Sequence, residues 1–229
     1  MVDIPFLRCR SDVAERLGAI SVVVVGDNAY ANQQMAQRLG RALGYVSMDT
    51  GAIIEQATGQ PVRDIVAAEG PTALAVAELQ VASALSTQLR ACISTCGGGV
   101  GVAAREKGWR YLFGQVAVWL DDNPNGSEEA APQRGAYGLA EIRVVVPTIN
   151  KESLDDAARQ VLKGIKDYTK RDADMPKRKG LYIKLGCRGD WPNIQHPDWR
   201  PDDWDEATDG ATSITKLAQQ HTEEKGTEV

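Results

Sequence analysis

The chain has 229 residues, of which 43% are apolar and 25% are charged, a composition that predicts a soluble globular protein with a sizeable core. Its net charge of −5 excludes a general attraction to nucleic acid or to an anionic membrane, and no apolar stretch approaches the roughly 20 residues of a membrane span. The first residues lack the apolar core of a secretory signal and are too short and acidic a stretch for a typical organelle transit peptide.

Five segments have the pattern of β-strands, and helical segments alternate with them. The clearest is the apolar run 18–27, which closes at Gly26 and is typical of a strand buried on both faces of a parallel sheet. The other strands are predicted at 45–49, 91–100, 114–122 and 140–148. Helices are predicted at 32–44, 51–58, 61–68, 72–90, 102–113 and 150–168. The alternation predicts an α/β fold with a parallel sheet and helices on both faces.

The last predicted helix has a candidate N-cap in Ser153, with Asp156 three residues further on. After this helix the composition changes from an α/β pattern to basic and then Trp/Pro/Asp-rich stretches. The whole chain is therefore divided into five predicted segments. They are a lead (1–17), the α/β domain (18–168), a basic linker (169–180), a Trp/Pro/Asp-rich extension (181–212) and a polar tail (213–229). The basic stretch Lys177–Lys179, which includes Arg178, is more typical of a solvated linker than of an RNA or lipid contact.

The cysteines give no sign of a metal site. Cys9, Cys92, Cys96 and Cys187 form no C-x-x-C pair, and His196 and His221 are the only histidines. On one strand, Cys92 and Cys96 would lie about 13 Å apart, too far for a disulfide. We therefore expect free structural thiols, a reducing compartment and no bound metal.

The junction after the first strand has the layout of a phosphate-binding loop but not its residues. Such a loop follows G-x-x-x-x-G-K-[ST], in which the lysine contacts the phosphates and the hydroxyl holds Mg²⁺. Counting from Gly26, the second glycine is replaced by Ala31, the lysine by Asn32 and the hydroxyl by Gln33. Two interpretations stay open: a plain strand–loop–helix junction, or a degenerate loop that still binds a nucleotide through the helix N-terminus.

Four stretches, 26–44, 48–66, 96–100 and 116–122, resemble the shikimate kinase family in the same order along the chain. The resemblance covers about residues 20–165 and implies a small P-loop kinase fold with a five-stranded parallel sheet. The functional positions of that family are kept only in part. Asp49 matches the carboxylate near Mg²⁺, whereas Gly51 replaces the carboxylate that meets the shikimate hydroxyls. Ala75 replaces the arginine that grips the shikimate carboxylate.

Two other family features are ambiguous or reduced. Gly97, Gly98 and Gly99 match the triple glycine that lines the substrate pocket, although such glycines also simply end a strand. The family folds an arginine-bearing lid over ATP, and here only about 16 residues, 123–138, separate the two flanking strands. Arg134 and Tyr137 resemble the later arginine–tyrosine pair with a spacing one residue short. The comparison with the family therefore implies that the lid is deleted, and with it the closure that excludes water.

The losses together predict a pseudoenzyme rather than an enzyme, because an active kinase needs cations on the transferring phosphoryl group. The resemblance extends to the plant and algal shikimate-kinase-like branch that is regarded as inactive and chloroplast-located. It implies a scaffold or assembly factor with protein partners, in a chloroplast multi-subunit complex, without cofactor and without ATP or shikimate. The alternatives are a ligand-sensing pseudokinase that binds a nucleotide or metabolite through Asp49 and Gly97–Gly99, and a weakly active small-molecule kinase.

The C-terminal extension supplies a candidate contact surface. Segment 179–194 resembles the tail of one plant member of that branch, in which a CS/p23-like domain precedes the kinase-like part. Trp191, Pro192, Trp199 and Trp204 lie close together in sequence, and tryptophan is enriched among interface anchors. The segment either packs back on its own domain or docks on a partner protein.

Overall fold

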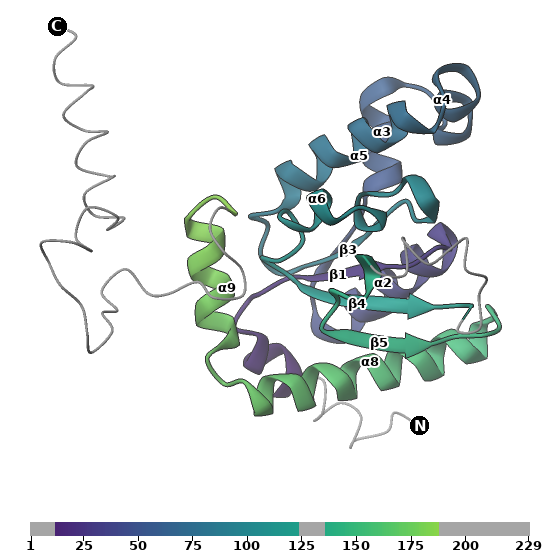
Figure 1. Cartoon of the computed structure of the whole chain (residues 1–229). Helices are drawn as coiled ribbons and strands as arrows, with labels where there is room; N and C mark the ends of the chain where they lie inside the picture. Colours follow the sequence, from purple (N-terminus) through teal and green to yellow (C-terminus); the bar gives the residue numbers. More distant parts are fainter. Residues whose placement is uncertain (1–11, 124–135, 188–229) are drawn as a thin grey trace, which may run out of the picture. The chain divides into compact units, whose positions relative to one another are not determined.

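The computed structural model describes residues 12–123 and 136–187, and strands and helices alternate through them (Figure 1). Five parallel strands form one sheet in the order β2-β3-β1-β4-β5. They are β1 (Val22–Val25), β2 (Val46–Asp49), β3 (Ala91–Ser94), β4 (Val116–Asp121) and β5 (Ile142–Val145). The predicted α/β fold with a five-stranded parallel sheet is confirmed, and each strand lies within its predicted range.

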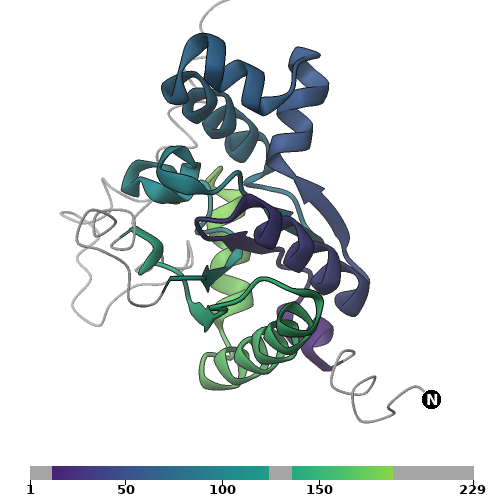
Figure 2. The same cartoon turned by 90° about the vertical axis from the view of Figure 1, so that its right-hand side faces the viewer.

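The valine run is uniformly apolar because β1 is central and covered on both faces. Val22 and Val24 pack against α2 (Ala29–Leu43) and α8 (Lys151–Arg171), which lie side by side on one face (Figure 2). Val23 and Val25 face a second cluster built around Trp109 and Trp119. The opposite face therefore carries helical segments as well, and no residue of β1 reaches solvent.

Three further helices, α3 (Thr50–Thr58), α4 (Val62–Glu69) and α5 (Pro71–Leu85), pack together around Ile54, Ile65 and Leu74. They appear as a group at the top of Figure 2. The predicted helices at 51–58 and 61–68 correspond closely to α3 and α4. The prediction of a helix over 72–90 is too long, because α5 ends at Leu85 and turns follow it.

The predicted helix over 102–113 is wrong for most of its length. A 3₁₀ turn (Val102–Ala104) is followed by the short α6 (Glu106–Trp109) and by turns. Gly108 lies so close to the Val102 carbonyl that any side chain would clash with it, and the indole of Trp109 donates to the Ala103 carbonyl at 2.8 Å. The chain folds back on itself to bury Trp109, and this tertiary contact overrides the helical propensity of the segment.

The ends of two helices also differ from prediction, because side-chain caps set them. Asn28 is the N-cap of α2 and accepts from the Ala31 N–H, so the helix begins at Ala29 rather than at residue 32. The N-cap of α8 is Asn150, not Ser153. Ser153 is the third helical residue and completes a reciprocal capping box with Asn150.

The segment predicted as a basic linker, 169–180, is helical instead. Helix α8 continues to Arg171, and α9 (Met175–Lys184) begins after three intervening residues, so 181–184 also belongs to a helix rather than to an irregular extension. Lys179 is fully buried, and its Nζ donates to the Phe113 and Gln115 carbonyls at 2.9 and 2.7 Å and to Glu141 Oε1 at 2.6 Å. The other oxygen of Glu141 accepts from the Ala117 N–H at 2.7 Å. A buried ion pair therefore fastens α9 to the start of β4.

Burial lowers the pKa of the Lys179 ammonium, and the Glu141 carboxylate opposes that shift. Replacing Lys179 by Met keeps the apolar stem but leaves Glu141 without its cation. We expect Lys179→Met to lower the free energy of unfolding by about 3–5 kcal/mol, as measured by urea denaturation.

The control is Lys177→Met, because the Lys177 side chain is 85% exposed and its pairing with Asp174 is solvated. This variant should match the wild type. The double variant Lys179→Met/Glu141→Gln should be more stable than Lys179→Met alone, since the unpaired carboxylate is gone. Equal stability of Lys179→Met and wild type would show that the pair does not hold α9.

Candidate functional site

The carboxyl ends of the five parallel strands meet at one edge of the sheet, which is where open α/β sheets bind their ligands. Gly26 follows β1 there, Asp49 ends β2, Thr95 follows β3 and Asp121 ends β4. The connections reverse direction between β1 and β3, so the loops after these two strands flank the usual position of a site. Every position singled out in the nucleotide loop and the triple glycine lies at this edge.

Asn32 lies in the first turn of α2, close to the loop that follows β1. Its side chain is completely buried, and Nδ2 donates to the Gly26 carbonyl at 3.0 Å and to the Thr95 carbonyl at 3.3 Å. The carboxamide thus links the carboxyl ends of β1 and β3. A side chain on Gly26 would meet the Leu120 carbonyl and Asn32 Oδ1, which explains the glycine. Asn32 Oδ1 has no hydrogen-bond partner within the described ranges.

The N-terminus of α2 is capped from within the chain. The Ala31 N–H donates to Asn28 Oδ1 at 2.9 Å. This backbone donor at the helix N-terminus is therefore not available to an external anion. Ala31 is buried and Gln33 is half-buried. Ala31 and Asn32 therefore lie in the first turn of α2 and Gln33 follows directly, and none of the three brings a positive charge.

The triple glycine packs against this loop. Gly97 has φ +71°, and a Cβ there would lie 2.7 Å from the carbonyl oxygens of both Gly26 and Asp27. Gly98 donates its N–H to the Asp27 carbonyl at 2.9 Å, while Gly99 is exposed. The close backbone contact between the two loops is enough to explain why glycine stands at positions 97 and 98. The contact supports the interpretation that these glycines close the strand end rather than line a pocket.

Tyr137 contacts both the loop after β1 and the triple glycine. Its hydroxyl lies 3.1 Å from Asp27 Oδ1 and 3.3 Å from the Gly98 carbonyl, and its ring packs 5.8 Å from Trp119. Burial, and then the Asp27 carboxylate, raise the pKa of the Tyr137 hydroxyl, which therefore stays protonated and donates. Tyr137 is buried. Its partner in the sequence comparison, Arg134, lies outside the described residues, as does most of the shortened lid segment.

Asp49 is engaged in local structure. Its Oδ1 caps α3 by accepting from the Ala52 N–H at 2.7 Å, and its Oδ2 accepts from the Ser94 hydroxyl at 2.6 Å. Gly51 lies beside it, where a Cβ would come within 3.2 Å of Asp49 Oδ1. Ala75 is buried in α5. Both oxygens of the carboxylate thus have protein partners, although the side chain is only half-buried.

Glu78 is a structural centre that the sequence did not reveal. It is completely buried, and it accepts from the Thr50 hydroxyl, the Cys96 N–H and the Val102 N–H at 2.6–2.7 Å. These bonds join α5 to α3 and to the segment after β3. The available signal was that Glu78 is the one charged residue between Pro71 and Leu85. With three hydrogen-bond donors, the buried Glu78 carboxylate has its hydrogen-bonding capacity met within the protein.

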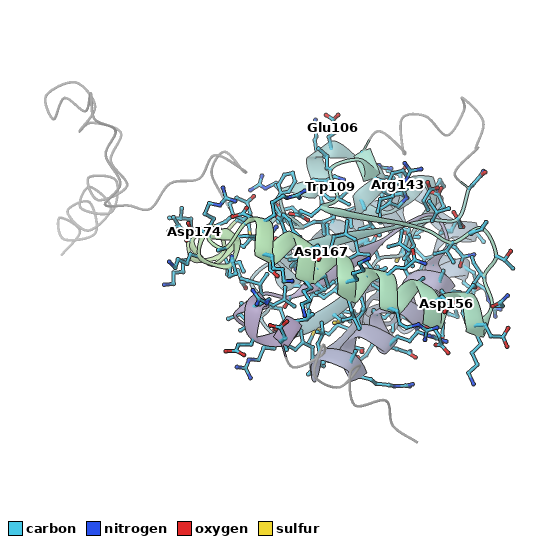
Figure 3. All side chains as sticks on the ribbon, turned by 90° about the horizontal axis from the view of Figure 1, so that it is seen from below. Glu106, Trp109, Arg143, Asp156, Asp167 and Asp174 are labelled. Carbon is cyan, nitrogen blue, oxygen red and sulfur yellow. The ribbon has the colours of Figure 1, made fainter. Side chains whose placement is uncertain are left out.

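The electrostatic balance of this edge is acidic. Asp27, Asp49 and Glu78 surround the loops, and the nearby guanidinium of Arg143 is bound to Asp121 and lies 4.7 Å over the Trp119 ring (Figure 3 labels Arg143). Burial, and then Glu78, also raise the pKa of the Cys96 thiol, which excludes it as a thiolate nucleophile.

Other classes of site are absent from the part of the chain that the structure describes. No group of three or more His, Cys, Asp or Glu side chains in 12–123 and 136–187 could hold a metal ion. None of the described helices has the length and apolarity to cross a membrane. Cys92, Cys96 and Cys187 are free thiols, as expected. Trp191, Pro192, Trp199 and Trp204 lie beyond the described residues, so the structure does not test them as contacts.

Comparison with known proteins identifies the family. Residues 33–128 match the shikimate kinase family model, a match that begins directly after Asn32. The chain is 34% identical over 194 residues to the Arabidopsis thaliana protein named "Probable inactive shikimate kinase like 2, chloroplastic", covering 81% of this chain and 50% of that protein. It is 33% identical over 111 residues to a shikimate kinase from Synechococcus sp. (strain JA-3-3Ab), covering 48% of this chain and 57% of that one. The chain thus spans about half the length of these two relatives.

Solved structures agree on the fold. The crystal structure of shikimate kinase from Aquifex aeolicus superposes with a TM-score of 0.55 at 17% identity, over 66% of this chain and 98% of that one. Shikimate kinase from Acinetobacter baumannii gives 0.51 at 18% identity, over 68% of this chain and 98% of that one. The predicted family is confirmed: the chain contains a shikimate kinase family domain and has the fold of shikimate kinases.

The role of Asn32 can be tested by Asn32→Asp, which is nearly isosteric. It replaces the donating NH₂ by a carboxylate oxygen that faces the Gly26 and Thr95 carbonyls. We expect a loss of about 3 kcal/mol or more in the free energy of unfolding near neutral pH, measured by chemical denaturation.

The pH dependence of this variant has a defined sign. The new carboxyl is buried beside two acceptors, so its pKa is raised in the folded state, and protonation restores a donor. The destabilisation should therefore be full above the folded pKa and shrink as the pH falls through it. The control is Asn150→Asp at the N-cap of α8, where aspartate still accepts from the Ser153 N–H. Equal stabilities of Asn32→Asp and Asn150→Asp would contradict the assigned hydrogen bonds.

Proposed function

We propose that this chain is a catalytically inactive shikimate-kinase-like protein that serves as a scaffold or assembly factor through protein–protein contacts in the chloroplast. The observation that carries the proposal is the buried Asn32 carboxamide. It stands where the family resemblance places the phosphate-binding lysine, and it holds the Gly26 and Thr95 carbonyls instead. A neutral group that is already bonded to the backbone offers no charge to a triphosphate.

The proposal that the chain is catalytically inactive depends on the missing positive charges. Phosphoryl transfer depends on positive charge at the transferring group, and each such contact contributes several kcal/mol to the transition state. The resemblance places Asn32 in the lysine position and Ala75 in the position of the substrate-binding arginine, and Ala75 is buried without a charge. Two losses of this size leave little rate enhancement.

The geometry of the loop opposes nucleotide binding as well. Asn28 caps α2 from inside, and Gly97 packs on the Gly26 and Asp27 carbonyls. Tyr137 adds a hydrogen bond to the Asp27 side chain. An incoming phosphate would have to break these contacts and approach the Asp27 carboxylate. We therefore infer that neither ATP nor shikimate is a ligand and that the protein needs no cofactor.

The proposed location rests on the Arabidopsis relative, whose name reads "chloroplastic". With catalysis gone, the retained fold can serve protein contacts, in a chloroplast multi-subunit complex. The tryptophans of the C-terminal extension, Trp191, Trp199 and Trp204, remain candidate contact residues together with Pro192. No nucleic acid partner is expected from the net charge of −5.

A second function, ligand sensing, has one observation in its favour. Asp49 and Gly97–Gly99 remain at the same edge of the sheet as the loop after β1, which is the arrangement of a binding site. Such a pseudokinase would bind a nucleotide or a shikimate-like metabolite without turning it over. The third hypothesis is a weakly active small-molecule kinase. It requires a positively charged side chain in the loop, and none of the described residues provides one there.

Titration calorimetry separates the first two functions. We expect no binding heat above dilution when ATP with Mg²⁺, shikimate, or both are added to the chain at high micromolar concentration. An active shikimate kinase, titrated in parallel, provides the positive control. Micromolar binding of either ligand would favour the sensing function over the scaffold.

Turnover is tested separately. A coupled assay for ADP release, with shikimate as the acceptor, should give a rate equal to that without protein. The variant Asn32→Lys, with Gln37→Lys further along α2 as a charge-matched control, shows whether the lysine alone restores binding. Turnover by the wild-type chain at a rate near that of the active control would overturn the proposal.

A further inference from the structure

Helices α3, α4 and α5, which we call the α3–α5 group, have an apolar cluster of their own (Figure 2). Its buried side chains are Ile54, Ile65 and Leu74, one from each helix, and it is separate from the two clusters that cover the faces of the sheet. Ala82, near the C-terminal end of α5, belongs instead to the cluster around Trp109. Apolar packing therefore attaches the end of α5 to the sheet more firmly than it attaches α3 and α4.

Glu78 lies at the junction between this group and the rest of the domain, and its side chain is completely buried. Oε1 accepts from the Thr50 hydroxyl at 2.7 Å and from the Cys96 N–H at 2.6 Å, and Oε2 accepts from the Val102 N–H at 2.6 Å. Thr50 is the first residue of α3, where the chain enters the group from β2. Cys96 and Val102 belong to the segment after β3. One carboxylate therefore connects α5 both to α3 and to the rest of the domain.

The arrangement at Glu78 needs a carboxylate. Its two oxygens accept from three donors, whereas a glutamine side chain has one acceptor oxygen and an NH₂ group. With glutamine, at least one of the three donors would face another donor inside the protein, which costs more than the net gain from a hydrogen bond. Because the three bonds share one side chain, they form and break together.

We propose that Glu78 is a latch: when its bonds are released, α3, α4 and the first half of α5 open together while the sheet stays folded. Local opening of this kind takes place in segments with few buried apolar contacts. The buried residues of α3 are Thr50 and Ile54, and that of α4 is Ile65. This inference concerns the dynamics of the domain, so it stands or falls independently of the proposed function.

The latch also reaches the carboxyl edge of the sheet. Cys96, whose N–H donates to Glu78, directly precedes Gly97, and a Cβ on Gly97 would lie 2.7 Å from the Asp27 carbonyl oxygen. The next residue, Gly98, donates its N–H to the same carbonyl at 2.9 Å. Release of the Glu78 bonds should therefore also loosen the contact between the triple glycine and the loop after β1.

Hydrogen–deuterium exchange of the full chain tests the latch. In Glu78→Gln, the amides of the α3–α5 group and of Gly98 should exchange at least about tenfold faster than in the wild type, because the group opens more often. Those of β1, β4 and α8 should keep their wild-type rates. The control is Glu55→Gln, since exposed Glu55 accepts from the Val62 N–H at 2.9 Å within the group. In this variant only amides near Val62 should change.

Two results would overturn the proposal. One is wild-type exchange in the α3–α5 group of Glu78→Gln, and the other is equal acceleration in every strand, which would mean that Glu78 stabilises the whole domain instead. Thr50→Val is the second test and applies even if Glu78→Gln does not fold, because it removes one donor and keeps the shape of the side chain. It should accelerate exchange in the same segments by a smaller factor. An unchanged α3–α5 group in Thr50→Val would likewise contradict the latch.

Trypsin cleavage gives an independent measurement. Arg63 is exposed but lies within α4, so cleavage after it requires local unfolding of that helix. The rate should rise by about tenfold in Glu78→Gln, in step with amide exchange. Lys163, which is exposed on α8, provides the internal control and should be cleaved at its wild-type rate. Equal acceleration at Arg63 and Lys163 would show that the whole domain has loosened.

Discussion

One buried carboxamide determines what the carboxyl edge of this sheet can do. Asn32 donates to the backbone carbonyls that follow β1 and β3, and so satisfies two acceptors that would otherwise face the interior without partners. The same position would hold a cation in an active loop of this layout. Since the carboxamide is neutral, buried and already bonded, it stabilises the junction between the strands and removes the charge on which phosphate binding depends.

The carboxylates around this edge also form hydrogen bonds within the protein. Asp49 caps α3 and accepts from the Ser94 hydroxyl, and Glu78 accepts from three donors in α3 and in the segment after β3. Asp27 lies within hydrogen-bond distance of the Tyr137 hydroxyl. The fold can thus persist without its chemistry, because the groups that remain have partners inside the protein. These bonds are compatible with the proposed non-catalytic function.

Local pattern predicted the fold well, and contacts between distant segments account for the failures. The valine run and the strand–helix alternation identify all five strands. The helix expected at 102–113 breaks because Trp109 is drawn into the core beside Gly108. Lys179 looks solvated in sequence, whereas the structure buries it and pairs it with Glu141, which is far away along the chain. Glu78 was missed for the same reason, since its three donors lie on segments that only the fold brings together.

The most direct test is a crystal structure of the full chain grown with Mg²⁺ and a non-hydrolysable ATP analogue. We predict that no triphosphate is ordered in the loop 26–32, and that Asn32 Nδ2 still donates to the carbonyls of Gly26 and Thr95. Ordered phosphates in that loop, held by a lysine or arginine of the chain and with the Asn32 side chain turned away, would contradict it.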